Sequence, residues 1–147
     1  MAAPDILAVA TALRDLVAQL PGLAEHEGKA QVFLGPQEAW ARTPAAEVIA
    51  DEIDLATLAA GAHRHRVNGV YHVVFYEQIG SDPERHEPVV MGLVKALLEE
   101  LVAAGFDPTL GGLTEDVRAV RVALDVTRRN NRPFRVAAVT LQLEADT

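Results

Sequence analysis

Cysteine is absent from this 147-residue chain, and aromatic residues make up only 5% of it. Without cysteine the chain forms neither a disulfide framework nor a thiolate metal site. No apolar run approaches the roughly 20 residues that a membrane-spanning helix needs, so we expect no span. The N-terminus shows no basic segment followed by a long apolar run, so we expect no signal peptide and a cytoplasmic protein.

Basic side chains are also few: 13 Lys and Arg face 21 Asp and Glu, which gives a formal charge of −8. This acidity disfavours a general nucleic-acid binder, although it leaves room for a local basic patch. Half of the residues are hydrophobic, which argues against a disordered chain. We therefore predict a single domain over residues 1–147, with a core of Val, Leu and Ala.

The strongest helical pattern covers residues 88–104. Its apolar side chains come in pairs four residues apart: Val89, Val90, Leu93, Val94, Leu97, Leu98, Leu101 and Val102. Pro88 suits a first helical turn, and Gly105 follows the last pair, where helices commonly end. A second helix is predicted over residues 6–20, with Asp5 as its N-cap. Each helix needs a partner layer to cover its apolar stripe.

Strand patterns fill much of the remaining chain. Residues 30–34 form a short candidate, and residues 63–79 form a long one in which Asn68-Gly69 is either a hairpin turn or a bulge. Residues 120–126 alternate apolar and polar side chains, and residues 134–143 pair back with them. We therefore expect an α+β fold, an antiparallel β-sheet with two α-helices packed on one face.

Residues 37–62 show no sustained period. Within them, residues 47–53 suit a strand, and residues 54–60 suit one or two turns of helix. Long stretches without regular structure in a small domain are usually functional loops or elements that the pattern hides. We expect an extended loop or insertion here.

Three histidines are the first candidates for chemistry. On a strand, His63 and His65 point the same way, as two metal ligands would, but Arg64 and Arg66 alternate with them and disfavour a divalent cation. His72 lies further along the same segment. We predict no specific metal site and no cofactor.

An acidic cluster and a glycine pair are the other candidates for chemistry. Asp51, Glu52 and Asp54 have no nucleophile or base partner that the sequence identifies, so a solvated face is favoured. Gly111-Gly112 matches no phosphate-binding pattern. We predict no catalytic residues and a protein that is not an enzyme.

Two features suggest an interface. Arg128, Arg129 and Arg132 gather at the last hairpin, either as a charged tip that protects a sheet edge or as a contact for an acidic partner or phosphate. Trp40, the only tryptophan, is either a core plug or an interface anchor. We name Trp40, Arg128, Arg129 and Arg132 as interface candidates.

In the order of its elements, the chain resembles the tail terminator, or tail completion, proteins of long-tailed bacteriophages, a family that includes the phage lambda tail terminator. Four segments carry the resemblance, namely residues 4–23, 66–78, 89–106 and 117–145. It is a likeness of length, order and pattern that spans most of the chain apart from residues 37–62.

The resemblance implies a structural virion protein. Family members form a homo-hexameric ring on the end of the tail tube, where the ring stops polymerisation of the tube protein and meets the head-tail connector. The implied location is the neck region of the virion, after assembly in the host cytoplasm, and DNA passes through the lumen without specific binding. The alternatives are another neck or head-tail joining protein, a small α/β ligand- or metal-binding domain, and a cellular dimeric interaction module.

Overall fold

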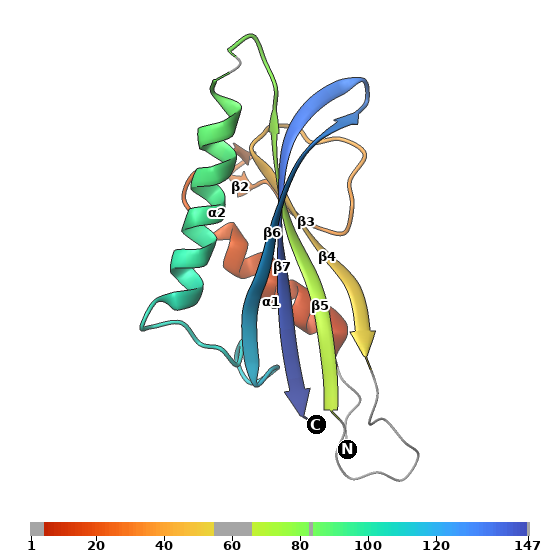
Figure 1. The fold of residues 1–147 in the computed structure, drawn as a ribbon, viewed down its shortest axis with the longest axis vertical. Coiled ribbons are helices and arrows are strands. Elements are labelled where there is room, and N and C mark those ends of the chain that lie inside the picture. The colour runs from red at the N-terminus through yellow and green to blue at the C-terminus, as the bar shows by residue number, and fades with distance from the viewer. Residues whose placement is uncertain (1–4, 55–65, 83, 147) are drawn as a thin grey trace.

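The computed structural model describes residues 5–54, 66–82 and 84–146 (Figure 1). In chain order the elements are α1 (Ile6–Ala18), β1 (Glu25–His26), β2 (Lys29–Ala30), β3 (Val32–Leu34), β4 (Ala45–Asp54), β5 (Arg66–Gln78), α2 (His86–Val102), β6 (Asp116–Arg129) and β7 (Arg132–Asp146). Neither described helix is long and apolar enough to cross a membrane.

The main sheet has five strands in the order β3-β4-β5-β7-β6. The strands β1 and β2 form a separate two-stranded sheet. β3 runs parallel to β4, whereas the other neighbouring pairs are antiparallel. The expected antiparallel sheet with two α-helices packed on one face is therefore wrong: the main sheet is mixed, a second sheet is present, and the structure has 44% strand against 24% helix.

One strand of the parallel pair, β4, lies within the stretch that we expected to be an extended loop or insertion. Residues 37–62 contain all of β4, an inner strand that includes the strand candidate at 47–53. The loop from residue 35 to 44 carries the chain back to the starting end of β3, so β4 sets out in the same direction (Figure 1). The possible helical turn at 54–60 lies largely outside the described residues.

The two helices begin and end close to their predicted bounds. The side chain of Asp5 caps α1, because its Oδ1 accepts a hydrogen bond from the amide of Ala8 at 2.9 Å. Pro88 lies in the first turn of α2, and the helix ends before Gly105. α1 packs against β3 and β4, and α2 packs against β5, β7 and β6.

The closing hairpin is confirmed. β6 and β7 pair along almost their whole length and join through a two-residue turn, in which Asn130 and Asn131 have φ values of 51° and 61°. Positive φ at both positions gives the twist that a tight hairpin needs, and asparagine tolerates it well. β5 is continuous through Asn68 and Gly69, and the bulge lies opposite, in β4 between Ala50 and Glu52.

Each face of the main sheet carries its own hydrophobic cluster. The face that we call the main-core face packs with both helices through side chains that include Leu13, Phe75, Leu97 and Leu141, all fully buried. The opposite face, here the second-core face, carries a smaller cluster of Val74, Tyr76, Phe134 and Val136 with Trp40, Ile49 and Ala138 packed against it.

Candidate functional site

An ion pair lies at the centre of the second-core face. Arg129 comes from the end of β6, and its Nη1 donates to Glu47 Oε2 on β4 at 2.9 Å. Its Nη2 donates to the hydroxyl of Tyr76 at 2.9 Å, and that hydroxyl donates to Glu47 Oε1 at 2.8 Å. We call Arg129, Glu47 and Tyr76 the Arg129 cluster.

The Arg129 cluster also holds the loop that precedes β4. Arg129 Nη1 donates to the carbonyl of Gln37 at 2.6 Å, and the amide of Gln37 donates to Glu47 Oε2 at 2.6 Å. Trp40 lies on the same cluster, 4.4 Å from the Tyr76 ring by centroids, with the Arg129 guanidinium 5.0 Å above its own ring. Cation–π contact and ion pairing thus fix the loop to the sheet.

The electrostatics of this cluster favour a structural role. Glu47 is fully buried, and its two carboxylate oxygens accept hydrogen bonds from Arg129, Tyr76 and Gln37. Burial raises the pKa of Tyr76 well above its ordinary value, and the neighbouring Glu47 carboxylate adds to this effect. A phenol that stays protonated is poorly suited to exchange protons with a substrate. The Glu47 carboxylate is fully buried and is held by three hydrogen-bond donors of its own chain.

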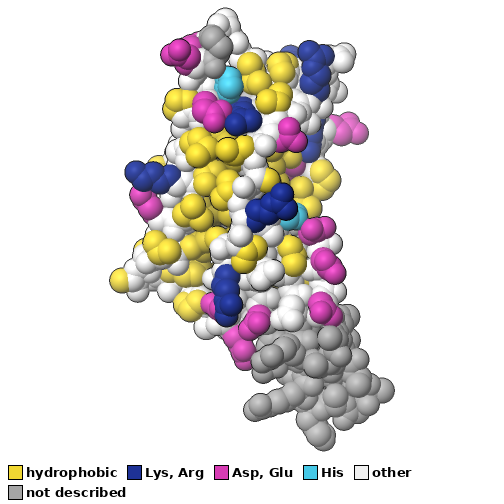
Figure 2. Space-filling model, viewed as in Figure 1, with side chains coloured by type: hydrophobic (Ala, Val, Ile, Leu, Met, Phe, Trp, Pro, Cys, Tyr) yellow, Lys and Arg dark blue, Asp and Glu magenta, His cyan; other side chains and the backbone are white. Residues whose placement is uncertain are grey.

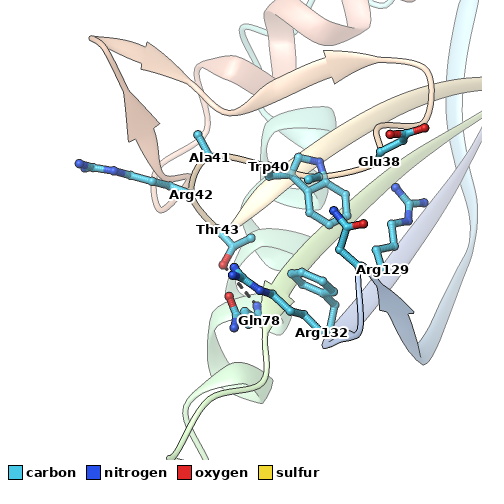
Figure 3. A pocket seen from close by; sticks show the side chains of 11 residues that line it. Glu38, Trp40, Ala41, Arg42, Thr43, Gln78, Arg129 and Arg132 are labelled. Carbon is cyan, nitrogen blue, oxygen red and sulfur yellow. Dashed lines mark hydrogen bonds between the residues drawn. The ribbon is translucent and has the colours of Figure 1, made fainter.

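A shallow hollow of about 250 Å³ lies beside the cluster (Figure 3). Trp40, Arg129 and Arg132 line it together with Thr43 and Gln78. Arg132 extends across the hollow toward Thr43 and Gln78 (Figure 3). Its two walls come from the loop before β4 and from the β6–β7 hairpin, which are far apart in the chain.

The four interface candidates occupy different positions. Trp40, Arg129 and Arg132 all line this hollow, whereas Arg128 is exposed on β6 and does not. Arg129 is engaged by its own chain, and the indole of Trp40 packs on Tyr76 and is half-buried. The structure therefore brings three of the four together, with Arg132 as the exposed cation among them.

A second polar group lies on the same face of the sheet. His72 Nε2 is 2.8 Å from Asp51 Oδ2, and His72 Nδ1 is 3.0 Å from the hydroxyl of Thr140. A hydroxyl, an imidazole and a carboxylate in line are the parts of a nucleophilic triad. Here the two contacts join side chains from three strands, and they tie β4, β5 and β7 together.

The remaining candidates for chemistry divide between described and undescribed residues. His63 and His65 lie outside the described residues. Within the described ranges no group of three or more His, Asp or Glu side chains is placed to hold a metal ion. The loop at Gly111 is closed by Asp107, which accepts hydrogen bonds from Thr109 and Gly111, and these bonds lower the pKa of the Asp107 carboxyl.

A broad hydrophobic surface covers α2 and β6 (Figure 2). Its exposed members on the helix are Met91 (42%) and Val102 (83%). On β6 they are Val120, Val122, Leu124 and Val126, each 39–53% exposed. We call these six side chains the α2–β6 surface. β6 is the last strand of the sheet, so its outer edge has no partner strand among the described residues.

Sequence patterns missed two parts of this picture. Glu47 was not identified as a buried acid from the sequence, although an acidic residue between apolar neighbours in a strand can indicate burial. Its partner Arg129 is 82 residues away, so the sequence did not indicate the pair. The alternation in β6 predicted a half-buried strand, but the apolar row lies largely exposed because α2 covers only part of it.

Comparisons with known proteins supply no family for this chain. No protein-family model matches it, and no curated protein matches its sequence. One solved structure, whose name describes no function, aligns over 94% of this chain and 90% of its own length, with 18% identity and a TM-score of 0.45. A similarity at that level carries no argument about function.

Proposed function

We propose that this chain is a structural protein of a long-tailed bacteriophage that forms a ring on the end of the tail tube, ends tube polymerisation and joins the tail to the head connector. The proposal starts from the resemblance in element order described above. In it the chain acts through contacts with copies of itself, with the tube protein and with the connector.

The observation that carries the proposal is the α2–β6 surface. Monomeric soluble proteins seldom expose a large contiguous apolar patch, and such patches usually mark interaction sites. Here the patch adjoins the outer edge of a 14-residue strand, β6, and that edge has no partner strand among the described residues. An open strand edge is a second element that recruits another chain, because its backbone groups are free to pair.

The charge distribution supports the same proposal. The formal charge of the chain is −8. A ring whose lumen carries like charge repels the phosphate backbone of DNA, so that DNA slides through without adhering.

The proposal expects a tail-tube gene beside the gene for this chain, and the test assembles the product of that gene into tubes with and without this chain. We expect this chain to bind tube ends and to hold tube length constant over time in electron micrographs. Leu124→Asp, on the α2–β6 surface, should abolish this effect, whereas Gln19→Asp, at the exposed end of α1, should retain it. Tubes that keep growing with the native chain present would refute the proposal, and so would turnover of a small substrate without any binding to tube ends.

A further inference from the structure

The exposed large hydrophobic side chains of the described residues fall into two groups at opposite edges of the sheet. One group is the α2–β6 surface, at the β6 edge. The other consists of Ile6 (40% exposed) and Leu7 (68% exposed) in the first turn of α1. α1 packs against β3 and β4, which form the other edge. Each edge of the sheet therefore offers apolar side chains to a partner.

Both edges also offer backbone groups. β6 is unpaired on its outer side, and β3 pairs only with Ala46, Glu47 and Val48 of β4. Residues 49–53 in the second half of β4 thus lie beyond the last pairing with β3, and no described strand pairs with their outer edge. β4 and β6 run in opposite directions, because three antiparallel pairings separate them. A copy placed beside β6 with its sheet in the same orientation presents β4 antiparallel to it.

The register puts opposite charges at the same height on these two edges. Glu52 pairs with Val70 of β5, and Val70 pairs with Gln142 of β7. Gln142 in turn pairs with Arg118 of β6, and Arg121 lies on the next row of the same face. Arg121 and Glu52 are exposed and, within the described chain, have no ion pair. Arg118 is held by Asp116 at 2.7 Å.

We infer that copies of this chain join edge to edge in a head-to-tail manner, with the second half of β4 of one copy antiparallel to the first half of β6 of the next. Arg118 and Arg121 then face the acidic end of β4, where Glu52 lies. Ile6 and Leu7 approach the α2–β6 surface from the same side of the joined sheet. The inference rests on the proposed ring and names the surfaces by which its subunits meet.

Head-to-tail contact uses two different patches, so it propagates around a ring, whereas a symmetric contact stops at a dimer. Pairing of β6 with a second β6 is the symmetric competitor. It leaves β4, Ile6 and Leu7 unused. Head-to-tail contact predicts that a disruptive variant on the β4 edge weakens self-association. Pairing of β6 with β6 predicts that the same variant leaves self-association unchanged.

Cysteine cross-linking separates them cleanly, because the native chain has no cysteine. The test variant carries Arg118→Cys and Glu52→Cys together, and a short bis-maleimide reagent tolerates small register offsets. We expect a ladder of covalent dimers, trimers and larger species, with each single variant remaining monomeric. The matched control pairs Glu52→Cys with Lys95→Cys on the exposed side of α2, and it should give no ladder.

Two results would overturn the head-to-tail contact. One is cross-linking of the Arg118→Cys single variant to dimers, with no trimer from the double variant. The other is a double variant that yields no more product than the control pair, both in free solution and on tail tubes. A ladder without tube-end binding would retain this contact and remove the phage role, whereas capped tubes without a ladder would do the reverse.

Discussion

The hairpin end of β6 and the middle of the same strand differ in what surrounds them. At the hairpin end, the charged Arg129 reaches inward and is bound by Glu47 and Tyr76. In the middle of the strand, the apolar side chains of Leu124 and Val126 are about half exposed. Charge is thus enclosed and hydrophobic surface is open along one strand, the reverse of the usual distribution. Along β6, polarity alone therefore does not tell which side chains stabilise the fold and which are available to a partner.

The largest effect is expected at the enclosed charge. Glu47→Ala should lower the free energy of unfolding by about 3–5 kcal/mol, since it leaves Arg129 and Tyr76 without their buried acceptor. Chemical denaturation measures this change. The control is Asp125→Ala on the exposed part of β6, which should stay within about 0.5 kcal/mol. Equal losses of unfolding free energy in the two variants would contradict the distinction between the hairpin end and the middle of β6.

The next effect concerns the two sides of α2. Leu97 is fully buried against the sheet, so Leu97→Ala should cost about 2–5 kcal/mol of unfolding free energy. Val102, which is 83% exposed on the same helix, is the matched control. Val102→Ala should shift the unfolding free energy by no more than about 0.5 kcal/mol. An unchanged melting midpoint in Leu97→Ala would contradict the central role that we assign to α2.

A smaller, pH-dependent effect is expected at Glu77. Burial raises the pKa of its carboxyl, and one carboxylate oxygen has no hydrogen-bond partner. The folded state therefore holds this proton more tightly than the unfolded state, and stability falls as pH rises through the folded pKa. Glu77→Gln should raise the melting midpoint at pH 7, and the gain should shrink below the ordinary carboxyl pKa. A gain that is the same at pH 4 and pH 7 would contradict this account.

The smallest effect on folding is expected on the α2–β6 surface. Leu124→Ser should change the unfolding free energy by less than about 0.5 kcal/mol, because the side chain is already 44% exposed. It should nevertheless reduce self-association, measured by sedimentation at matched concentrations of native and variant protein. Gln19→Ser is the control and should associate like the native chain. If Leu124→Ser unfolds the protein, the surface belongs to the core rather than to an interface.

Local patterns predicted the elements whose partners are near in sequence. The cap at Asp5, the bounds of α2 and the β6–β7 hairpin follow from periodicity and turn chemistry. The parallel pairing of β3 with β4 does not, because it depends on how the loop between them returns across the sheet edge. A local sequence pattern does not predict the path of this loop between β3 and β4.

The same reasoning explains what was missed at the site. Glu47 and Arg129 lie 82 residues apart, so neither neighbourhood in the sequence signals their pairing. Arginines near a hairpin tip are predicted to be solvated, and for Arg128 and Arg132 the structure agrees. Arg129 differs because strand alternation turns its side chain to the second-core face, where Trp40 and Tyr76 form a pocket for the guanidinium.

The irregularities at the two sheet edges set the geometry of any joint between copies. The bulge in β4 falls between Ala50 and Glu52, and β6 has a register shift of its own between Ala119 and Arg121. The two irregularities lie at about the same level along the strands of the sheet. A bulge bends its strand and sharpens the local twist. In the proposed assembly, strands that meet at these bends would not form the flat, unbroken ladder of a fibril, and each joint would turn the next copy by the same amount. A constant turn closes a ring only when the turns add up to a full circle with no rise along the axis, and otherwise it gives a helical filament. In the proposed ring the number of members is therefore decided by an angle.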